Sequence, residues 1–388
     1  MTIPRIYSAA TGRRPVRNLV RACLGVLVVA VARSGGAQST NQDSLALRLR
    51  RAEDAIAVLQ QQLAEQSESG VQSRSRVSVE ITGRVLMNAF GNSRRVNNVD
   101  NPQFVRPDTI AGFPARGIGM AMRQTRLALA VRVPDVLRGR FDGDLDVDFA
   151  GGQQPSSGGR TFPLVRLRTA RGFVRWTHAE AMIGQESPLI SGLNPISAAA
   201  VATPDFAAAG NLWLWLPQVR LGLQSGGRVR VGAQGAVLAP TSGDAAGAFD
   251  TDNDLAERSQ RPYVQARAFA SWGEGETTRE IGCGVHQGWL VPVATRVSSQ
   301  AIACDALFPV TEWLELRGEY FNGQALRGLG GGGIGQNLSP SGTPLNTSGG
   351  WAQVNVRSMS SWRAGVGCGG DHPEALATRR RNDACAAY

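Results

Sequence analysis

Residues 141–149 read Phe-Asp-Gly-Asp-Leu-Asp-Val-Asp-Phe, so Asp142, Asp144, Asp146 and Asp148 alternate with small or apolar residues. A period of two residues is that of a β-strand, whose successive side chains point to opposite faces. Burying an unpaired carboxylate costs on the order of several kcal/mol, so a soluble β-sandwich could hold this strand only with its acidic face in water. In a transmembrane β-barrel the apolar face meets lipid and the polar face lines a wet lumen. The stretch therefore favours a strand of such a barrel.

The same period continues from Val77 almost to the end of the chain. About thirteen segments alternate in this way, separated by clusters of Gly, Pro, Ser and Asp. Short links such as residues 134–138 alternate with long ones such as residues 244–260, as periplasmic turns and extracellular loops do in outer-membrane barrels. We therefore expect an all-β, transmembrane, antiparallel β-barrel over residues 77–388. Tryptophans near predicted strand ends suit aromatic girdles at the membrane interfaces, namely Trp176, Trp213, Trp215, Trp272, Trp313 and Trp351.

The first 37 residues have the organisation of a secretory signal peptide. An apolar run over residues 22–32 is preceded by Arg13, Arg14, Arg17 and Arg21, and small residues follow as far as Ala37. The run is about half of the roughly 20 apolar residues that a membrane-spanning helix needs. We therefore expect residues 1–37 to be removed by cleavage before Gln38 rather than kept as an anchor.

The net charge of +10 does not indicate a nucleic-acid partner. Six of the 41 basic residues lie in the leader, which has no acidic residue, so 35 basic and 31 acidic residues remain, a net charge of +4. A balance of this size does not call for a polyanionic ligand.

A heptad pattern follows the leader, within residues 38–65. Its apolar residues recur at alternating spacings of four and three, which is the seam of a coiled coil. The seam consists of Leu45, Leu49, Ala52, Ile56, Leu59 and Leu63. A helix of this length is marginal in water unless it packs against something, so we expect self-association, with an amphipathic helix packed on its own domain as the alternative. Residues 66–76 are polar and predict a flexible linker.

Arginines accompany the aspartates on the predicted wet face. The candidate pore-lining residues are Arg123, Arg126, Arg132, Asp142, Asp144, Asp146, Asp148, Arg166 and Arg168. Facing basic and acidic side chains create a transverse field that can orient polar solutes without binding them tightly. The alternative is that these groups pair across strands and hold the shape of the barrel.

No pattern in the sequence indicates catalysis, a metal or a cofactor. Cys283, Cys304, Cys368 and Cys385 lack zinc spacing; a Cys283–Cys304 disulfide and unpaired cysteines acting as small apolar residues both remain open. Gly328, Gly330 and Gly333 match a dinucleotide-binding fingerprint, but no parallel strand–helix unit surrounds them, so a loop is expected. The three histidines lie in no recognisable nucleophile setting. An enzyme is therefore not expected.

Several short segments resemble those of the DcaP-like outer-membrane porins, within the phosphate-selective porin superfamily. They are Arg123-Gln124-Thr125-Arg126-Leu127, Leu167-Arg168-Thr169-Ala170, Gly184-Gln185, Gly210-Asn211-Leu212, Pro217-Gln218-Val219-Arg220-Leu221, Arg317-Gly318-Glu319 and Gly350-Trp351-Ala352-Gln353. The resemblance implies a homotrimer of barrels of about 16 strands, each enclosing a pore, with the helical segments in the periplasm. It also implies passive diffusion of small hydrophilic, preferably anionic, solutes across the outer membrane. In that arrangement residues 186–210 would fold inward and narrow the pore, with a surface loop as the equal alternative.

The C-terminus departs from this resemblance. After Gly367 the residues do not alternate convincingly where further strands are expected, so the barrel is predicted to lack C-terminal strands and its closure is in question. The alternative function is therefore an outer-membrane anchor or tether with a non-conducting barrel. A third hypothesis is an outer-membrane hydrolase, in which a serine, a histidine and an acidic residue would have to lie together in one site.

Overall fold

The computed structural model describes residues 70–72, 77–107, 115–152, 162–197, 200, 202–244, 252–357, 362–374 and 381–388. All described residues belong to one compact unit, Ser67–Tyr388. The predicted signal peptide and coiled-coil helix lie outside the described residues. None of the helical segments within the described ranges has the length and apolar character needed to cross a membrane.

Seventeen strands make up almost all of the regular structure. They are β1 (Gly70–Gln72), β2 (Ser78–Arg84), β3 (Asn88–Asn92), β4 (Gly117–Ala121), β5 (Arg126–Val136), β6 (Gly139–Asp148), β7 (Arg166–Arg175), β8 (Ala179–Glu186), β9 (Leu216–Gln224), β10 (Val229–Leu238), β11 (Tyr263–Trp272), β12 (Arg279–Leu290), β13 (Val297–Pro309), β14 (Leu314–Gln324), β15 (Asn346–Arg357), β16 (Arg363–Pro373) and β17 (Asn382–Ala387). In the described part of the chain, three single 3₁₀ turns join them: η2 (Glu257–Ser259), η3 (Gly275–Thr277) and η4 (Arg327–Leu329). Within the predicted linker, Gly70–Gln72 form backbone pairs with the edge of β2.

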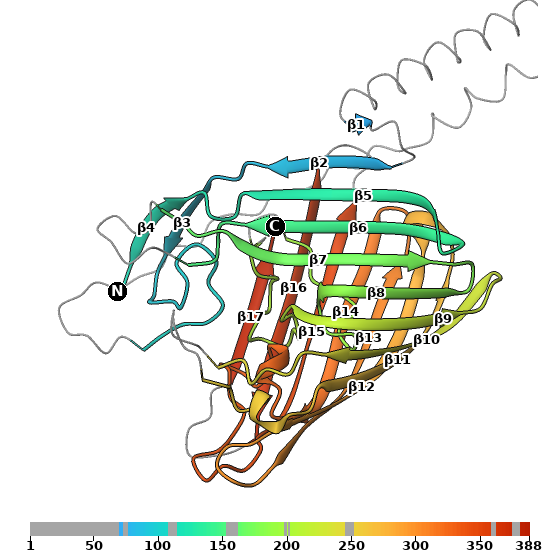
Figure 1. Cartoon of the computed structure of the whole chain (residues 1–388). Coiled ribbons are helices and arrows are strands. Elements are labelled where there is room, and N and C mark those ends of the chain that lie inside the picture. The colour runs from blue at the N-terminus through green and yellow to red at the C-terminus, as the bar shows by residue number, and fades with distance from the viewer. Residues whose placement is uncertain are drawn as a thin grey trace, which may run out of the picture. The chain divides into compact units, whose positions relative to one another are not determined.

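Fifteen strands form one antiparallel sheet in the order β1-β2-β5-β6 and then consecutively to β17, while β3 and β4 form a separate hairpin. The sheet curls, so that β13 to β17 pass behind β5 to β8 (Figure 1). Among the described residues no backbone ladder joins β17 to β1 or β2, so the ring of strands is not closed. At this seam the Asn382 amide donates to the carbonyl oxygens of Gln103 and Ala208 at 2.9 and 3.0 Å.

The links between strands alternate in length, as predicted. At one end of the sheet the links are short, for example residues 137–138, 176–178 and 225–228. At the other end they are longer, for example residues 149–165, 187–215, 239–262 and 325–345. This alternation is the pattern of periplasmic turns and extracellular loops in outer-membrane barrels.

Burial along the strands is the reverse of that in a soluble protein. In β11, Gln265 and Arg267 are buried while Val264, between Tyr263 and Gln265, is 44% exposed. The outward face carries Val219, Leu221, Val231, Ile281, Val285, Ile302, Leu316, Val354 and Val366. The inward face carries Gln218, Gln265, Arg267, His286, Asp305, Glu315, Glu319, Gln353, Asn355 and Asp371. Strands with apolar residues outside and polar residues inside suit a lipid surround and a polar interior.

The prediction that strands do not continue after Gly367 is wrong for the described residues, because β16 extends to Pro373 and β17 follows at Asn382–Ala387. The predicted lack of closure agrees with the open ring of strands among the described residues. The hydrophobic pattern of β16 is weak because its inner face is filled by another part of the chain. A Cβ atom on Gly369 would lie 2.3 Å from the Ala209 carbonyl oxygen, so only glycine fits there. The strand therefore lacks the side chains that would reveal its period.

Two disulfides cross-link neighbouring strands, and both lie between directly opposite residues. Cys283 of β12 is bonded to Cys304 of β13, which settles the earlier alternative in favour of the disulfide. Cys368 of β16 is bonded to Cys385 of β17. Three of these cysteines, Cys283, Cys368 and Cys385, are exposed on the outward face. Each bridge fixes the register of its strand pair.

Candidate functional site

The inner face of β5 to β8, here called the charged wall, brings the four aspartates of β6 against arginines of both neighbouring strands. Asp142 pairs with Arg140 at 2.9 Å and with Arg175 at 2.7 Å. Asp144 pairs with Arg171 at 2.9 Å. At the short-link end of β6, each aspartate is therefore paired with at least one arginine.

The remaining aspartates are paired as well. Asp146 contacts Arg126 and lies 3.4 Å from Arg168, and Asp148 pairs with Arg166 at 2.6 Å and with Arg168 at 2.9 Å. The alternative in which these groups pair across strands is thus what the structure shows. Ion pairs of this kind hold neighbouring strands in register.

Water access differs along the charged wall. The side chains of Asp144, Arg171, Arg126 and Arg175 are 30–36% exposed, whereas the Asp148 side chain is fully buried. Charged groups that keep this much accessible surface on an inward face need water beside them. Water therefore reaches the middle and the short-link end of the wall. At the long-link end it reaches Arg126 but not Asp148, which is opposite Arg126 in the ladder.

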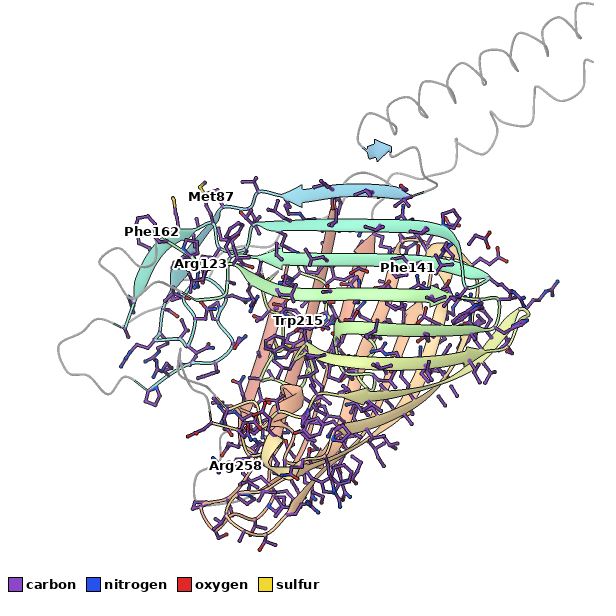
Figure 2. All side chains as sticks on the ribbon, in the orientation of Figure 1. Met87, Arg123, Phe141, Phe162, Trp215 and Arg258 are labelled. Atoms are coloured by element: carbon purple, nitrogen blue, oxygen red, sulfur yellow. A yellow bond between two sulfur atoms is a disulfide. The ribbon has the colours of Figure 1, made fainter. Side chains whose placement is uncertain are left out.

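Two predicted pore-lining arginines lie apart from this network. Arg123, labelled in Figure 2 near the β3–β4 hairpin, is buried and donates through Nε to Asp100 Oδ2 at 3.1 Å. Arg132 is opposite Asp142 in the ladder, but its side chain is 60% exposed and lies 3.6 Å from Glu80. The structure therefore brings together Arg126, Arg166 and Arg168 with the aspartates and leaves the other two outside.

Sequence periodicity missed Arg171 and Arg175, because β7 contains a bulge. Asp146 is opposite Thr169 and Val147 is opposite Leu167, so Arg168 is an extra residue in the ladder. Strict alternation from Arg166 would turn Arg171 and Arg175 to the lipid side. The bulge turns both of them inward, where Arg175 also pairs with Glu180 at 2.6 Å.

Aromatic rings pack against the guanidinium groups of four arginines of the charged wall. The Trp215 ring, labelled in Figure 2, lies 5.3 Å from Arg166 Cζ and 4.6 Å from Arg168 Cζ. The Phe173 ring lies 5.7 and 4.2 Å from Arg171 and Arg175. Carboxylates and rings together restrict the motion of these guanidinium groups.

Residues 187–215, here called the inner link, cross the interior between β8 and β9. Ser191 Oγ donates to Glu319 Oε2 of β14 at 2.7 Å. The Gln353 side chain of β15 makes two hydrogen bonds with the backbone of Ile196, at 2.7 and 2.8 Å. On the charged wall, Arg168 donates to the Ala202 carbonyl oxygen at 2.7 Å. The predicted inward position of residues 186–210 is confirmed by these contacts.

The inner link also contributes to an apolar cluster inside the sheet, at the long-link end. The cluster consists of Leu189, Ile190, Leu212, Leu216, Ala236, Leu238, Ala256, Tyr263, Leu290, Ala301, Ala303, Phe321, Ala325, Leu326 and Leu329. It contains residues of three long links and of the strands that they cover. This part of the interior is therefore packed like a protein core.

Arg220 of β9 is a charged side chain beside Ser187, at the start of the inner link. Among the described residues it forms no ion pair; it donates to the Ser187 carbonyl oxygen at 3.2 Å and to Gln218 Oε1 at 3.0 Å. Its Nε is buried and has no hydrogen-bond partner. A buried guanidinium nitrogen without a partner can be satisfied by an anion.

Two carboxylates in the long links have shifted pKa values. Burial raises the pKa of Asp205 in the inner link, and a hydrogen bond from Ser197 offsets this only in part. Burial also acts to raise the pKa of Asp254, but hydrogen bonds from the backbone of Glu257, Ser242 and Ala256 and from the Thr241 hydroxyl outweigh it. The pKa of Asp254 therefore lies below its ordinary value.

The residues considered for other chemistries have structural partners. Gly328 lies in the link between β14 and β15, where a Cβ atom would meet the Thr241 carbonyl oxygen at 2.0 Å. His286 Nε2 is 3.1 Å from Ser299 Oγ, but both residues are buried and Ser299 donates to the Ala325 carbonyl oxygen. Within the described ranges no group of three or more His, Cys, Asp or Glu side chains is arranged to hold a metal ion.

Solved structures share this architecture. The outer membrane channel DcaP of Acinetobacter baumannii is similar with a TM-score of 0.56 and 16% sequence identity, over 79% of this chain and 82% of that chain. The fold is that of an outer-membrane β-barrel porin. The anion-selective porin from Comamonas acidovorans is similar with a TM-score of 0.49 and 13% identity, over 80% of this chain and 83% of that chain. No protein-family model and no curated protein matches the chain. The predicted resemblance to DcaP-like porins is thus confirmed at the level of the fold.

Proposed function

We propose that this porin allows small hydrophilic, preferably anionic, solutes to diffuse passively across the outer membrane. The observation that carries the proposal is the wet part of the charged wall, where charged side chains on the inward face keep about a third of their surface accessible. A wall of fixed, paired charges presents a polar path without a tight binding site. Outer-membrane lipid and the transported solutes are the only ligands that this function needs.

The anionic preference rests on Arg220. The aspartates of the charged wall are neutralised by arginines, whereas Arg220 retains an unpaired positive charge and an unsatisfied Nε. The field of this uncompensated charge would attract a solute carboxylate or phosphate that passes along the wall. We further propose a homotrimer with residues 38–65 in the periplasm, supported by the heptad seam in the sequence.

The test is single-channel conductance of the purified chain, without residues 1–37, in a planar bilayer under a salt gradient. We expect stepwise openings in groups of three and a reversal potential that shows anion preference. A chain shown to be folded that gives no conductance would support the alternative function, a non-conducting outer-membrane anchor. The inner link, which crosses the interior, would then act as a plug.

A further inference from the structure

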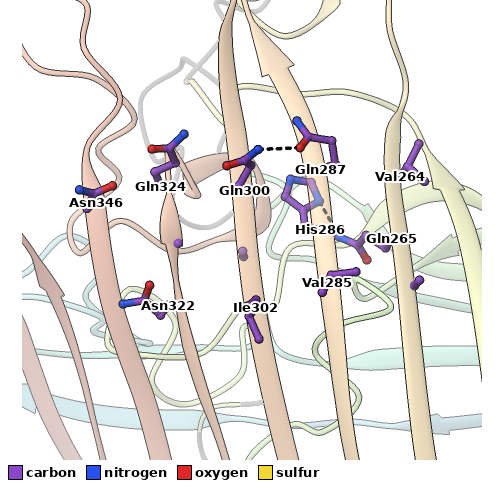
Figure 3. A pocket seen from close by; sticks show the side chains of 13 residues that line it. Val264, Gln265, Val285, His286, Gln287, Gln300, Ile302, Asn322, Gln324 and Asn346 are labelled. Atoms are coloured by element: carbon purple, nitrogen blue, oxygen red, sulfur yellow. Dashed lines mark hydrogen bonds between the residues drawn. The ribbon is translucent and has the colours of Figure 1, made fainter.

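A row of four carboxamide side chains crosses the outward face of the sheet at its long-link end. Gln287 of β12 is directly opposite Gln300 of β13, which is opposite Gln324 of β14, which is opposite Asn346 of β15. Figure 3 shows these four side chains next to one another across four strands. We call them the carboxamide row.

On β12 and β13 the row borders an apolar surface, whereas the next outward residue on β14 is Asn322. The next outward residues toward the middle of β12 and β13 are Val285 and Ile302, which are 51% and 61% exposed. A groove of about 580 Å³ runs along this boundary. The carboxamide row, continued by Val264 opposite Gln287, lines one side, and Ala266, Val285, Ile302 and Asn322 line the other. Such a groove fits an amphipathic molecule, with a polar part against the row and a hydrocarbon part against the aliphatic residues.

Hydrogen bonding within the row leaves acceptors available. Gln300 Nε2 donates to Gln287 Oε1 at 2.8 Å, Gln324 Nε2 donates to Ser298 Oγ at 2.8 Å, and Asn346 Nδ2 donates to Glu374 Oε2 at 2.9 Å. The side-chain oxygens of Gln300, Gln324 and Asn346 accept no hydrogen bond from any described residue. Three neighbouring acceptors call for a ligand that brings several donors.

The charge of the groove narrows the choice of ligand. Its lining includes no arginine, aspartate or glutamate, and its one histidine, His286, is buried on the inward face. A phosphate headgroup would find acceptors and no cation there, whereas the hydroxyl groups of a sugar are neutral donors. A sugar on a lipid chain matches both sides of the groove.

We propose that the carboxamide row and the groove beside it bind the sugar headgroup and the adjoining acyl chain of a glycolipid in the membrane leaflet at the long-link end. This inference rests on the membrane position in the proposed function, because only a membrane-inserted sheet presents its outward face to lipid. The row then marks the level at which the hydrocarbon region ends and the headgroup region begins.

The experiment uses the chain without residues 1–37 in phosphatidylcholine vesicles that contain a small fraction of diglucosyl diacylglycerol with a photoreactive acyl chain. Cross-linking yield is compared for the unmodified chain, for a variant with Gln300→Leu and Gln324→Leu, and for Gln185→Leu as the control. Gln185 is the matched residue because it also faces outward, on β8, away from the groove. Cross-links are mapped by mass spectrometry.

We expect cross-links at β12 to β14, and a drop of about tenfold in yield for the double variant because two acceptors are lost, with no change for Gln185→Leu. Equal yields with diacylglycerol that lacks the sugar would overturn the proposal. So would a change from trimer to monomer in the double variant, since the row would then be covered by a second copy of the chain. Conductance measurements on the same variants separate the two proposals. If no variant conducts, the porin function is refuted. If all variants conduct alike, the cross-linking yields alone decide the lipid site.

Discussion

Charged side chains are more exposed on the charged wall than on the inner face of β11 to β15, which we call the opposite wall. On the charged wall Arg171 and Arg175 are 31% and 36% exposed, although both are paired. On the opposite wall Arg267 and Asp305 form an ion pair at 2.7 Å and are 5% and 1% exposed. The inner link contacts the opposite wall through Glu319 and Gln353. Water therefore reaches one wall and the chain itself covers the other, so under our proposal solutes pass along the charged wall.

The largest effect is expected from Asp148→Asn at the long-link end of the charged wall. This change leaves Arg166 and Arg168 short of a carboxylate in a buried position, which costs about 3 kcal/mol of unfolding free energy. Asp142→Asn, at the short-link end, should cost about 1 kcal/mol or less, since Arg175 keeps Glu180. Urea unfolding in lipid vesicles measures both. Equal losses would mean that Asp148 and Asp142 do not differ in water access.

Shortening the inner link is the next largest change. Replacing residues 190–206 by a short Gly-Ser segment uncovers the opposite wall and should raise single-channel conductance severalfold. Ser191→Ala, which removes only the hydrogen bond to Glu319, is the control and should leave conductance near its original value. An unchanged conductance in the shortened variant, shown to be folded by its electrophoretic mobility before and after heating, would place the solute path elsewhere.

Removing the unpaired cation should give a moderate effect on selectivity. Arg220→Gln is expected to lower the anion-to-cation permeability ratio about twofold, because the fixed positive charge beside the path is lost. Arg138→Gln in the exposed turn between β5 and β6 removes the same charge away from the wall and should change the ratio little. Reversal potentials under a salt gradient measure both variants. A matching shift in the control would show that net charge, and not position, sets selectivity.

The smallest effect concerns a long link outside both walls. Since the pKa of Asp254 is lowered in the folded state, its hydrogen bonds stabilise the link above the ordinary pKa of about 4, and this contribution is lost as the pH falls through the lowered value. Amide exchange at Ala256 and Glu257 should become faster as the pH falls through that range. The corresponding decrease in the opening free energy should be less than about 1 kcal/mol. Asp254→Asn should remove most of the pH dependence. A variant with the same pH profile as the unmodified chain would refute this assignment.

The sequence predicted the strands well where one face is plainly polar. In β6 the four aspartates define the strand and its inward face without knowledge of its neighbours. The pairing of those aspartates could not be predicted, because partners depend on register. The bulge at Arg168 illustrates this, since it reverses the face assigned to Arg171 and Arg175 and can be seen only against β6.

Elements whose partners are distant in sequence were harder to predict. Trp351 suited an interfacial girdle, yet it is buried on the inward face and stacks with Phe206 of the inner link at 6.2 Å between ring centroids. The glycines of β16 and the small residues of β17 concealed both strands for the same reason, as the inner link fills the space beside them. A loop that packs inside a barrel thus removes the periodicity of the strands that it covers.

The Cys368–Cys385 bridge bears on how such a barrel is made. It ties the last strand to the one before it through a closed loop, and both sulfur atoms belong to residues exposed on the outward face. A slip of one residue along β16 would turn Asp383 toward the interior and Ala384 toward lipid, and the covalent bond forbids that slip. Because thiols are oxidised in the periplasm and not in the cytosol, a chain destined for the outer membrane would bring this hairpin to the bilayer as a preassembled piece. Oxidation then becomes a step in biogenesis, and a cell that lacks periplasmic thiol oxidase should accumulate a chain whose last strand is free to mispair.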